Sequence, residues 1–270
     1  MDLLEPAVAR VRRLETAAAD ALAPAEEVRV DGWRLRFNHG VTRRGNSALP
    51  EARGLRPIAR KLREVRDFYA ARGLPARLQL SSASRPAGLD AILEARGWRF
   101  EEGARVLTRA LGDPPPGPDA RAEAACADVR LAAEPDDAYR AVQESVTPRA
   151  SDWADARSVA LHEVGLRPWH LVLSDAAGRP VATGLTVVHP RARLAGLFSL
   201  ATRPEARGRG YATRLIRAAL DRARADGATA AYLQVAGGND AALRLYRRLG
   251  FREHHRYHYR RQVAAGETAS

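Results

Sequence analysis

A loop rich in glycine and arginine stands directly ahead of a predicted helix. Residues 207–213 read Arg-Gly-Arg-Gly-Tyr-Ala-Thr. Glycines allow a tight turn and the close approach of a ligand. The first amides of a helix lack intrahelical partners and carry the positive end of its dipole, which favours anions. Arg207 and Arg209 add positive charge, so the segment predicts a site for phosphate groups. It has neither the dinucleotide spacing nor the Gly-Lys-Ser/Thr ending of nucleotide-binding loops.

Two patterns together resemble a known enzyme superfamily. The first is Arg207-x-x-Gly210-x-Ala212, which resembles the acyl-CoA pyrophosphate motif of the GNAT N-acetyltransferases. The second runs from Asn239 as Asn-x-x-Ala-x-x-x-Tyr-x-x-x-Gly-Phe and is similar to the next conserved segment of that superfamily, at the expected distance. The resemblance covers about residues 128–262.

The resemblance implies a site for acetyl-CoA as co-substrate. In such a site the loop amides hold the pyrophosphate, and the preceding strand pairs with the pantetheine arm and polarises the thioester carbonyl. Asn239 is expected to contact the arm, although capping a helix is an equal alternative. The cofactor-binding residues expected from the resemblance are Leu200, Ala201, Thr202, Arg207, Gly208, Arg209, Gly210, Tyr211, Ala212, Thr213 and Asn239.

Tyr246 is the catalytic residue that the resemblance implies. It is expected to protonate the departing sulfur as a general acid. The alternative is a core aromatic that shares a helix face with Leu243 and Leu249.

The general base is open at this stage. The superfamily often supplies a carboxylate from the strand before the loop, but residues 198–202 contain none. The candidates are Glu144, Glu163, His162, His170 and a chain of water molecules. His254 and His258 are four residues apart without a third ligand at diagnostic spacing, so we expect no metal site.

The elements that position these residues follow from periodicity and turn signals. Apolar positions recur with helical spacing in segments 138–145, 211–225 and 241–249. Strands are expected at residues 169–173, 181–188, 195–202, 230–235 and 251–259. Antiparallel strands followed by strand–helix–strand units predict an α/β fold. Under the resemblance, this becomes two GNAT-like domains, each with a mixed, mostly antiparallel sheet flanked by helices.

A repeat relates the two halves of the chain at an offset of 154 residues. Residues 50–54 and 204–208 have the same sequence, Pro-Glu-Ala-Arg-Gly. The chain is thus similar to tandem GNAT proteins, with a degenerate first copy. Arg56 and Pro57 stand where the second copy has glycine and tyrosine, so one amide donor is lost. Leu93 stands at the position of the catalytic tyrosine. We therefore expect the first half to bind no acetyl-CoA.

The composition limits the remaining functions. Of the 44 basic residues among 270, only Lys61 is lysine, and the net charge is +12. Arginine binds phosphates well, but a GC-rich coding sequence explains the same bias. The charge is spread evenly, with no basic arm for nucleic acid. Alternating basic and aromatic residues at 33–37 and 256–260 fit half-exposed strands better than single-strand binding. The single cysteine, Cys126, excludes an intramolecular disulfide.

A proline-rich segment beginning at residue 113 predicts a boundary. We expect a degenerate GNAT-like domain at 1–112, a Pro/Ala-rich linker at 113–127, a catalytic domain at 128–262 and a flexible tail at 263–270. Neither a signal peptide nor an apolar run of about 18 residues is seen, which favours a cytoplasmic protein without membrane contact. The ending Tyr-His-Tyr-Arg at 257–260 resembles a bacterial group of the superfamily.

The predicted function is transfer of an acetyl group from acetyl-CoA to a primary amine. Transfer is expected to be direct, in a ternary complex, because no nucleophile is placed for a covalent intermediate. The acceptor is a small-molecule or peptide amine, and the protein is expected to be a monomer or homodimer. One alternative is a non-catalytic, regulatory protein that binds acyl-CoA. Another is a basic nucleic-acid-binding protein.

Overall fold

The computed structural model describes residues 6–112, 129–147 and 154–263. These residues divide into two compact units, which are described separately. The C-terminal unit lies within residues 106–254, and the N-terminal unit comprises the described residues up to 105 together with those from 255 onward. Two strands, β5 (Arg99–Ala110) and β11 (Arg252–Arg261), contribute residues to both units.

The C-terminal unit is built on a sheet with the strand order β6-β7-β8-β9-β10. Strands β6 to β9 pair in antiparallel fashion, and β9 and β10 pair in parallel. The sheet is therefore mixed and mostly antiparallel, which confirms the predicted fold class. The elements are β6 (Val129–Ala132), α5 (Asp137–Val146), α6 (Ala154–Glu163), β7 (Arg167–Ser174), β8 (Pro180–His189), β9 (Leu194–Thr202), the 3-10 helix η1 (Pro204–Ala206), α7 (Tyr211–Ala225), β10 (Ala230–Ala236) and α8 (Asp240–Arg248).

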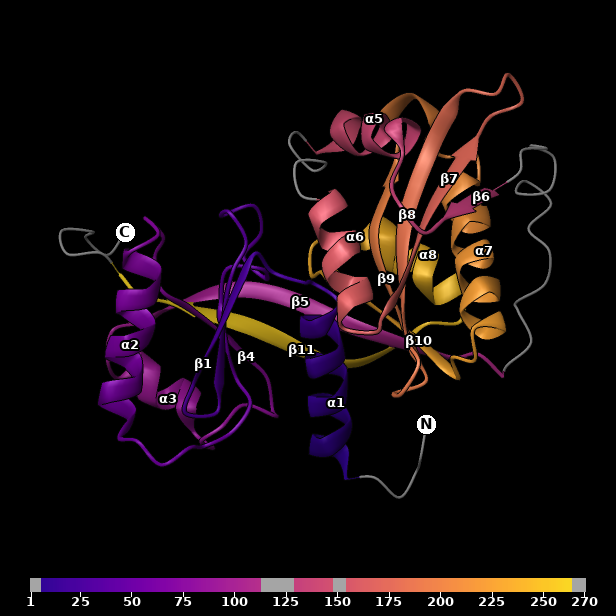
Figure 1. The fold of residues 1–270 in the computed structure, drawn as a ribbon. Helices are drawn as coiled ribbons and strands as arrows, with labels where there is room; N and C mark the ends of the chain where they lie inside the picture. Colours follow the sequence, from indigo (N-terminus) through magenta and orange to yellow (C-terminus); the bar gives the residue numbers. More distant parts are fainter. Residues whose placement is uncertain (1–5, 113–128, 148–153, 264–270) are drawn as a thin grey trace. The chain divides into compact units, whose positions relative to one another are not determined.

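Helix α7 packs on this sheet through the apolar face that its sequence predicts. Leu215, Ile216, Ala219 and Ala223 are each at most 1% exposed, and their spacing places them on one side of the helix. They join core residues of β7 to β10 in one apolar cluster. In Figure 1, α5 and α6 lie on one side of β7–β9 and α7 lies on the other. The site described below forms where β9 leads into α7.

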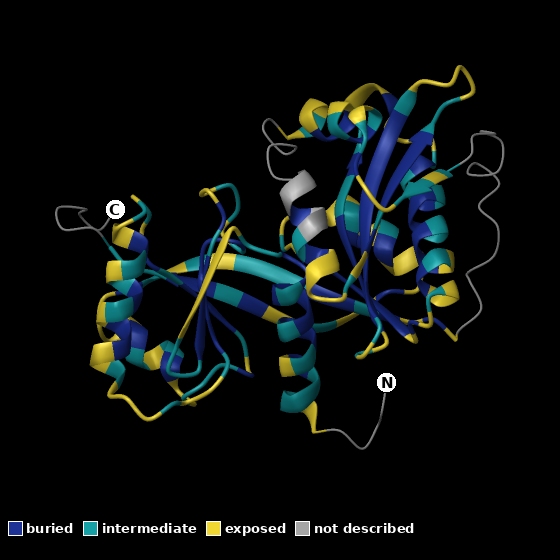
Figure 2. Ribbon diagram, viewed as in Figure 1, coloured by how far each residue is buried: buried dark blue, intermediate teal, exposed yellow. Residues whose placement is uncertain are grey.

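The N-terminal unit has the strand order β1-β2-β3-β4-β11-β5. Trp33, Tyr69 and Leu78 in its apolar core are fully buried, and the other buried residues of this core are at most 5% exposed. Figure 2 shows buried residues on the strands at the centre of this unit. Strand β11 from the end of the chain pairs antiparallel with β4, with His258 opposite Leu80. The other elements are α1 (Ala7–Asp20), β1 (Glu26–Val30), β2 (Trp33–Phe37), β3 (Ala48–Pro50), α2 (Ile58–Ala70), β4 (Arg77–Leu80) and α3 (Leu89–Glu94).

The backbone repeats between the two halves where the sequence does. Three pairs of glycines, each separated by the repeat offset or one residue less, adopt positive φ in both copies. These pairs are Gly54 and Gly208, Gly73 and Gly227, and Gly97 and Gly250. Positive φ strongly favours glycine, so the matched turns explain why glycines stand at corresponding positions in the two halves.

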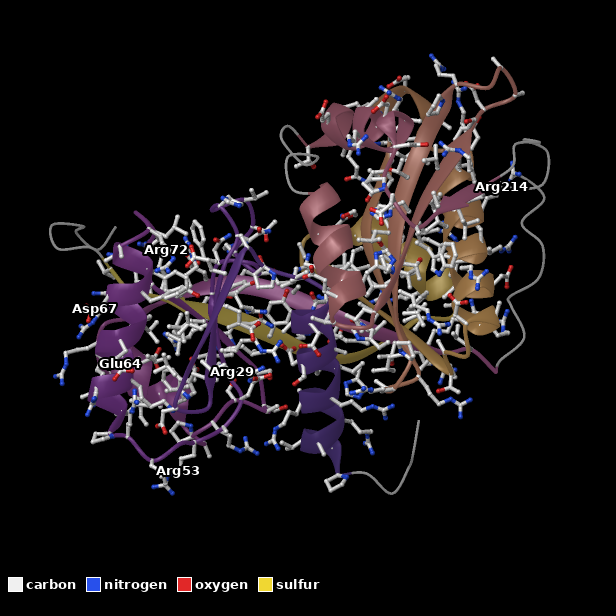
Figure 3. All side chains as sticks on the ribbon, viewed as in Figure 1. Arg29, Arg53, Glu64, Asp67, Arg72 and Arg214 are labelled. Carbon is white, nitrogen blue, oxygen red and sulfur yellow. The ribbon has the colours of Figure 1, made fainter. Side chains whose placement is uncertain are left out.

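The arginine surplus is partly neutralised within each unit. In the N-terminal unit, Arg29 of β1 lies 2.8 Å from a carboxylate oxygen of Glu51. In the C-terminal unit, Nη1 of Arg224 on α7 lies 2.8 Å from Oδ1 of Asp221. The arginines labelled in Figure 3 come from different elements, including Arg214 on α7. These ion pairs need no external anion, in line with the even spread of charge in the sequence.

The histidines near the end of the chain take part in hydrogen bonds of the N-terminal unit. Nε2 of His255 lies 2.7 Å from Oε1 of Glu15, and Nε2 of His258 lies 2.9 Å from Oδ1 of Asp90. Within residues 6–112, 129–147 and 154–263, no group of three or more histidine, cysteine, aspartate or glutamate side chains is arranged to hold a metal ion. In the same part of the chain, no helix combines the length and apolar character needed to cross a membrane.

Candidate active site

A pocket of about 630 Å³ opens in the C-terminal unit between the end of β9, the following loop, α7 and α8. It is lined by eleven of the twelve site residues predicted from the sequence. Arg209 is the exception: it is exposed and does not line the pocket. The predicted residues that line it are Leu200, Ala201, Thr202, Arg207, Gly208, Gly210, Tyr211, Ala212, Thr213, Asn239 and Tyr246.

The loop ahead of α7 has the geometry of an anion cradle. Gly208 and Gly210 have φ of +76° and +81°, a conformation in which other residues are strained. Gly210 is the N-cap of α7, and no side chain caps the helix. The first amides of α7 are therefore left for a ligand. A Cβ built on Gly208 would meet no atom within 4 Å, so the loop is open above this position.

Strand β9 is interrupted by a β-bulge just before it reaches the pocket. Its register with β8 shifts between Thr183 and Leu185, and Ser199 adopts φ of +49°. The register of β9 with β10 ends at Leu197 and Leu233. A bulge bends its strand and disrupts pairing. Beyond this point residues 200–202 of β9 line the pocket. These residues are not in register with β10.

Tyr246 lies on α8 and forms part of the pocket wall. Its side chain is both a wall residue and a core residue: it is 9% exposed, and its ring meets that of Phe251 edge to face at 6.1 Å. Burial raises the pKa of Tyr246 to about 12. The hydroxyl therefore keeps its proton at neutral pH, which suits a hydrogen-bond donor or a general acid.

Asn239 is the N-cap of α8. Its Oδ1 accepts a hydrogen bond from the amide of Ala242 at 3.1 Å, which is the capping role weighed from the sequence. Asn239 also lines the pocket. Its contact with a cofactor stays a prediction.

Several lining residues were not selected from the sequence. They are Val146, Ala206, Leu215, Ile216, Ala241, Ala242, Leu245 and Arg248. Arg248 in the last turn of α8 is the only charged side chain among them. Leu245 follows Ala242 by three residues and Ala241 by four, and Arg248 follows Leu245 by three. This helical spacing was the available signal, because residues three and four apart share a helix face.

None of the four side chains named as general bases lines the pocket. Glu144 and Glu163 are exposed, and His162 lies 3.5 Å from Glu134. His170 is only 3% exposed, and its Nδ1 lies 3.1 Å from the carbonyl of Ala133. The base stays a prediction, with the chain of water molecules among its candidates.

A carboxylate fills the corresponding loop of the N-terminal unit. The loop at residues 53–56 matches the loop at residues 207–210 in the repeat. The amides of Leu55 and Arg56 donate hydrogen bonds of 2.9 and 2.8 Å to the two carboxylate oxygens of Asp31. These backbone bonds hold the pKa of Asp31 below its usual value. Asp31 thus supplies, from within the chain, the anion that such a loop favours.

Lys61 also binds Asp31 and the loop at residues 53–56. Its side chain is 1% exposed, and its Nζ lies 3.5 Å from Oδ2 of Asp31. The ammonium donates to the carbonyls of Asp31 and Arg53 at 2.7 and 2.9 Å and lies 4.3 Å from the centre of the Trp33 ring. Beside the changes at Arg56 and Pro57, this occupied loop is a further reason to predict that the first half binds no acetyl-CoA.

Replacing Asp31 with asparagine is expected to lower the free energy of unfolding at neutral pH. The folded-state pKa of Asp31 is depressed, so its carboxylate stabilises the fold above the unfolded pKa of about 3.9, and this stabilisation is lost as the pH falls through the lower folded value. The gap between wild type and Asp31→Asn in urea unfolding should therefore be widest near pH 7 and close toward pH 3. Asp67→Asn on the exposed side of α2 is the control (Figure 3). A gap that does not depend on pH contradicts this account.

Nearly the whole chain has counterparts among known proteins. A model of the family described as "Probable histone acetyltransferase Rv0428c C-terminal" matches residues 8–260. The chain belongs to this family. Membership of this acetyltransferase family confirms the prediction that the protein is a GNAT-type acyltransferase. The chain is also 26% identical over 262 residues to "Uncharacterized N-acetyltransferase YobR" of Bacillus subtilis, covering 93% of this chain and 98% of that protein.

Solved structures of the superfamily share the fold over nearly the whole chain. A GCN5-related N-acetyltransferase from Kribbella flavida superimposes with a TM-score of 0.67 at 18% identity, covering 94% of this chain and 96% of that one. A tandem GNAT protein from the clavulanic acid biosynthesis pathway gives a TM-score of 0.62 at 17% identity, covering 97% and 96%. These matches confirm the predicted fold, which the chain shares with GNAT proteins that include a tandem one.

Proposed function

We propose that this member of the acetyltransferase family transfers the acetyl group of acetyl-CoA to a primary amine. The observation that supports the proposal best is the convergence in one pocket of an uncapped helix N-terminus, a bulged strand edge and the hydroxyl-bearing side chain of Tyr246. Each part of an acyl-CoA molecule then has a matching chemical group. The amides fit the pyrophosphate, the strand edge fits the pantetheine amides, and the tyrosine faces the sulfur.

The cradle residues do the binding in this proposal. The amides from Gly208 to Thr213 donate to phosphate oxygens, while Arg207 supplies a charge at the pocket wall. The backbone of residues 200–202 pairs with the arm and donates to the thioester carbonyl, where negative charge develops. A bound thioester supplies the acetyl group. The loop and strand therefore set the position of the carbonyl before the amine arrives.

Tyr246 carries the proton needed at the end of the reaction. As the bond from the amine nitrogen to the carbonyl carbon forms, the bond to sulfur breaks and the thiolate takes a proton from the tyrosine hydroxyl. The proton lost by the amine goes to water or to one of the candidate bases, and the tyrosinate regains its proton from solvent before the next turnover. The transfer is direct, within a ternary complex.

We propose the same division of the chain as the sequence predicts. In this division, residues 128–262 are the catalytic domain, in the cytoplasm, and residues 1–112 are the degenerate copy, while the linker at 113–127 and residues 264–270 of the tail lie outside the described residues. The compact units differ from this division at two strands, because residues 106–110 of β5 belong to the C-terminal unit and residues 255–261 of β11 belong to the N-terminal unit. The family description directs attention to histone-type lysines as acceptors, alongside small-molecule amines.

The function is tested by calorimetric titration with acetyl-CoA, followed by an assay of free CoA release. The panel should include a lysine-rich histone-tail peptide, polyamines and aminoglycosides. We expect saturable acetyl-CoA binding, and release of CoA that requires one class of amine. Mass spectrometry then locates the acetyl group. Absence of acetyl-CoA binding contradicts the proposal.

The alternative is an acyl-CoA-binding protein without turnover. This alternative is favoured by one observation: none of the four side chains named as general bases lines the pocket, so no side chain there is assigned to accept the proton of the amine. Binding of acetyl-CoA without CoA release across the amine panel favours it over the enzyme.

A further inference from the structure

The bulge in β9 is held by a side chain from outside the sheet. Nε2 of Gln143, on α5, donates to the carbonyl of Ser199 at 2.5 Å and to Oγ1 of Thr183 at 2.8 Å. Gln143 is 7% exposed and Thr183 is fully buried. One amide group therefore connects the bulge residue of β9 to the neighbouring strand β8.

The bulge places a non-glycine residue in a backbone conformation that needs support. Ser199 has φ of +49°, a region that costs free energy for residues with a Cβ and that persists only where the surroundings fix it. Its carbonyl is turned out of the β8–β9 ladder and accepts from Gln143 instead. Without that partner the half-buried carbonyl loses its hydrogen bond, and the regular ladder becomes the competing arrangement.

Strand β8 is adapted to the same bulge. Gly184 lies where the register between the two strands shifts. A Cβ on Gly184 would come within 2.8 Å of Cδ2 of Leu200 and 3.1 Å of Cδ2 of Leu215. The absence of a side chain lets Leu200 lie over β8, and from there Leu200 lines the pocket. The bulge and the wall of the pocket are thus one structural feature.

We infer that Gln143 is a positioning residue for the thioester end of acetyl-CoA, acting through the bulge that directs residues 200–202 into the pocket. The inference depends on the proposed function, because it concerns the strand edge to which the pantetheine arm is assigned. Gln143 does not line the pocket itself. Loss of Gln143 should therefore weaken the binding of the pantetheine arm and of the thioester carbonyl. It should not affect the binding of the phosphate groups, which is assigned to the loop that begins at Arg207.

The test compares two ligands on the full-length protein. Gln143→Met keeps the length of the side chain and removes the donor. Calorimetry should show acetyl-CoA binding weakened by at least about tenfold, because the variant loses both hydrogen bonds that the Gln143 amide donates to β8 and β9. Binding of 3′-phosphoadenosine 5′-diphosphate, which lacks the arm, should stay within about twofold. Gln79→Met is the matched control: Gln79 is also buried and hydrogen-bonded, but it lies in the N-terminal unit and should affect neither ligand.

Hydrogen exchange gives a readout that does not depend on acetyl-CoA. Amides in residues 197–202 should exchange faster in Gln143→Met, while those of residues 211–220 should keep their wild-type rates. If wild type binds no acetyl-CoA, the proposed function fails, and exchange still decides whether Gln143 holds the bulge. Wild-type acetyl-CoA affinity in Gln143→Met, or an equal loss for both ligands, overturns the inference.

A second pair of variants covers the case in which Gln143→Met does not fold. Thr183→Val removes the hydroxyl that accepts from Gln143, and Thr183→Ser retains it. We expect Thr183→Val to weaken the binding of acetyl-CoA more than the binding of 3′-phosphoadenosine 5′-diphosphate. We expect Thr183→Ser to bind acetyl-CoA with nearly wild-type affinity. Equal behaviour of the two threonine variants contradicts the role of the amide.

Discussion

The substitution Gly210→Glu is expected to abolish acetyl-CoA binding. Gly210 has φ of +81° at the N-cap of α7, where a residue with a Cβ costs about 1–2 kcal/mol. The new carboxylate would also lie beside the amides assigned to the pyrophosphate, and like charges in contact cost several kcal/mol. Together these effects predict a loss of affinity of at least about 100-fold, measured by calorimetry.

Two control variants separate strain from charge. Gly210→Ala introduces strain without charge and should lose about tenfold in affinity. Gly178→Glu places a glutamate at φ of +77° in the turn between β7 and β8, with no atom within 4 Å of the added Cβ. That turn does not line the pocket, so binding should be retained. Wild-type affinity in Gly210→Glu contradicts the assignment of the loop to phosphate.

The cradle was predictable because its determinants are local. Helix α7 begins and ends where the sequence indicates, at Tyr211 and Ala225, since glycine and Asp-Gly mark its ends and one apolar stripe marks its face. Strand β9 extends to Thr202 as expected. A loop with two glycines at the start of a helix presents its amides whatever else the fold contains.

The supports of the site were not predictable in the same way. Helix α6 was missed, because Ala154–Glu163 has almost no amphipathic pattern. The bulge at Ser199 lies within an apolar strand, Leu194–Thr202, whose sequence has no proline or alternation that would mark it. Its partner Gln143 is 56 residues away along the chain, so the contact depends on the packing of α5 against β9 and β8. Tertiary contacts of this kind leave no mark in local spacing.

The filled loop of the N-terminal unit shows the same limit. Arg56 and Pro57 indicated a lost cradle, because they change residues within the motif itself. Asp31 lies 24 residues before Leu55 and carries no motif. Only the fold reveals that its carboxylate accepts the loop amides. The sequence therefore indicated that the first copy is degenerate, and the structure adds an internal anion as the physical reason its loop can persist without a phosphate ligand.

The substitution Tyr246→Phe is expected to lower kcat by about 100-fold, which is the lower end of the range for the loss of a general acid. The ring and its edge-to-face contact with Phe251 are retained, so acetyl-CoA affinity should stay within about twofold. Tyr232→Phe is the matched control, because its hydroxyl is fully buried against His189 and does not line the pocket. Calorimetry and steady-state release of CoA, with the acceptor identified from the amine panel, measure the two effects.

The pH dependence of kcat provides the decisive check on Tyr246. A general acid must be protonated, so its contribution is present below its pKa and is lost above it. Burial raises that pKa to about 12, and the ionisation of Tyr246 should therefore cause no loss of wild-type rate between pH 7 and 10. A fall in rate in that range that vanishes in Tyr246→Phe contradicts a buried, protonated tyrosine. An unchanged kcat in the variant removes Tyr246 from the reaction and leaves it as a core aromatic of α8.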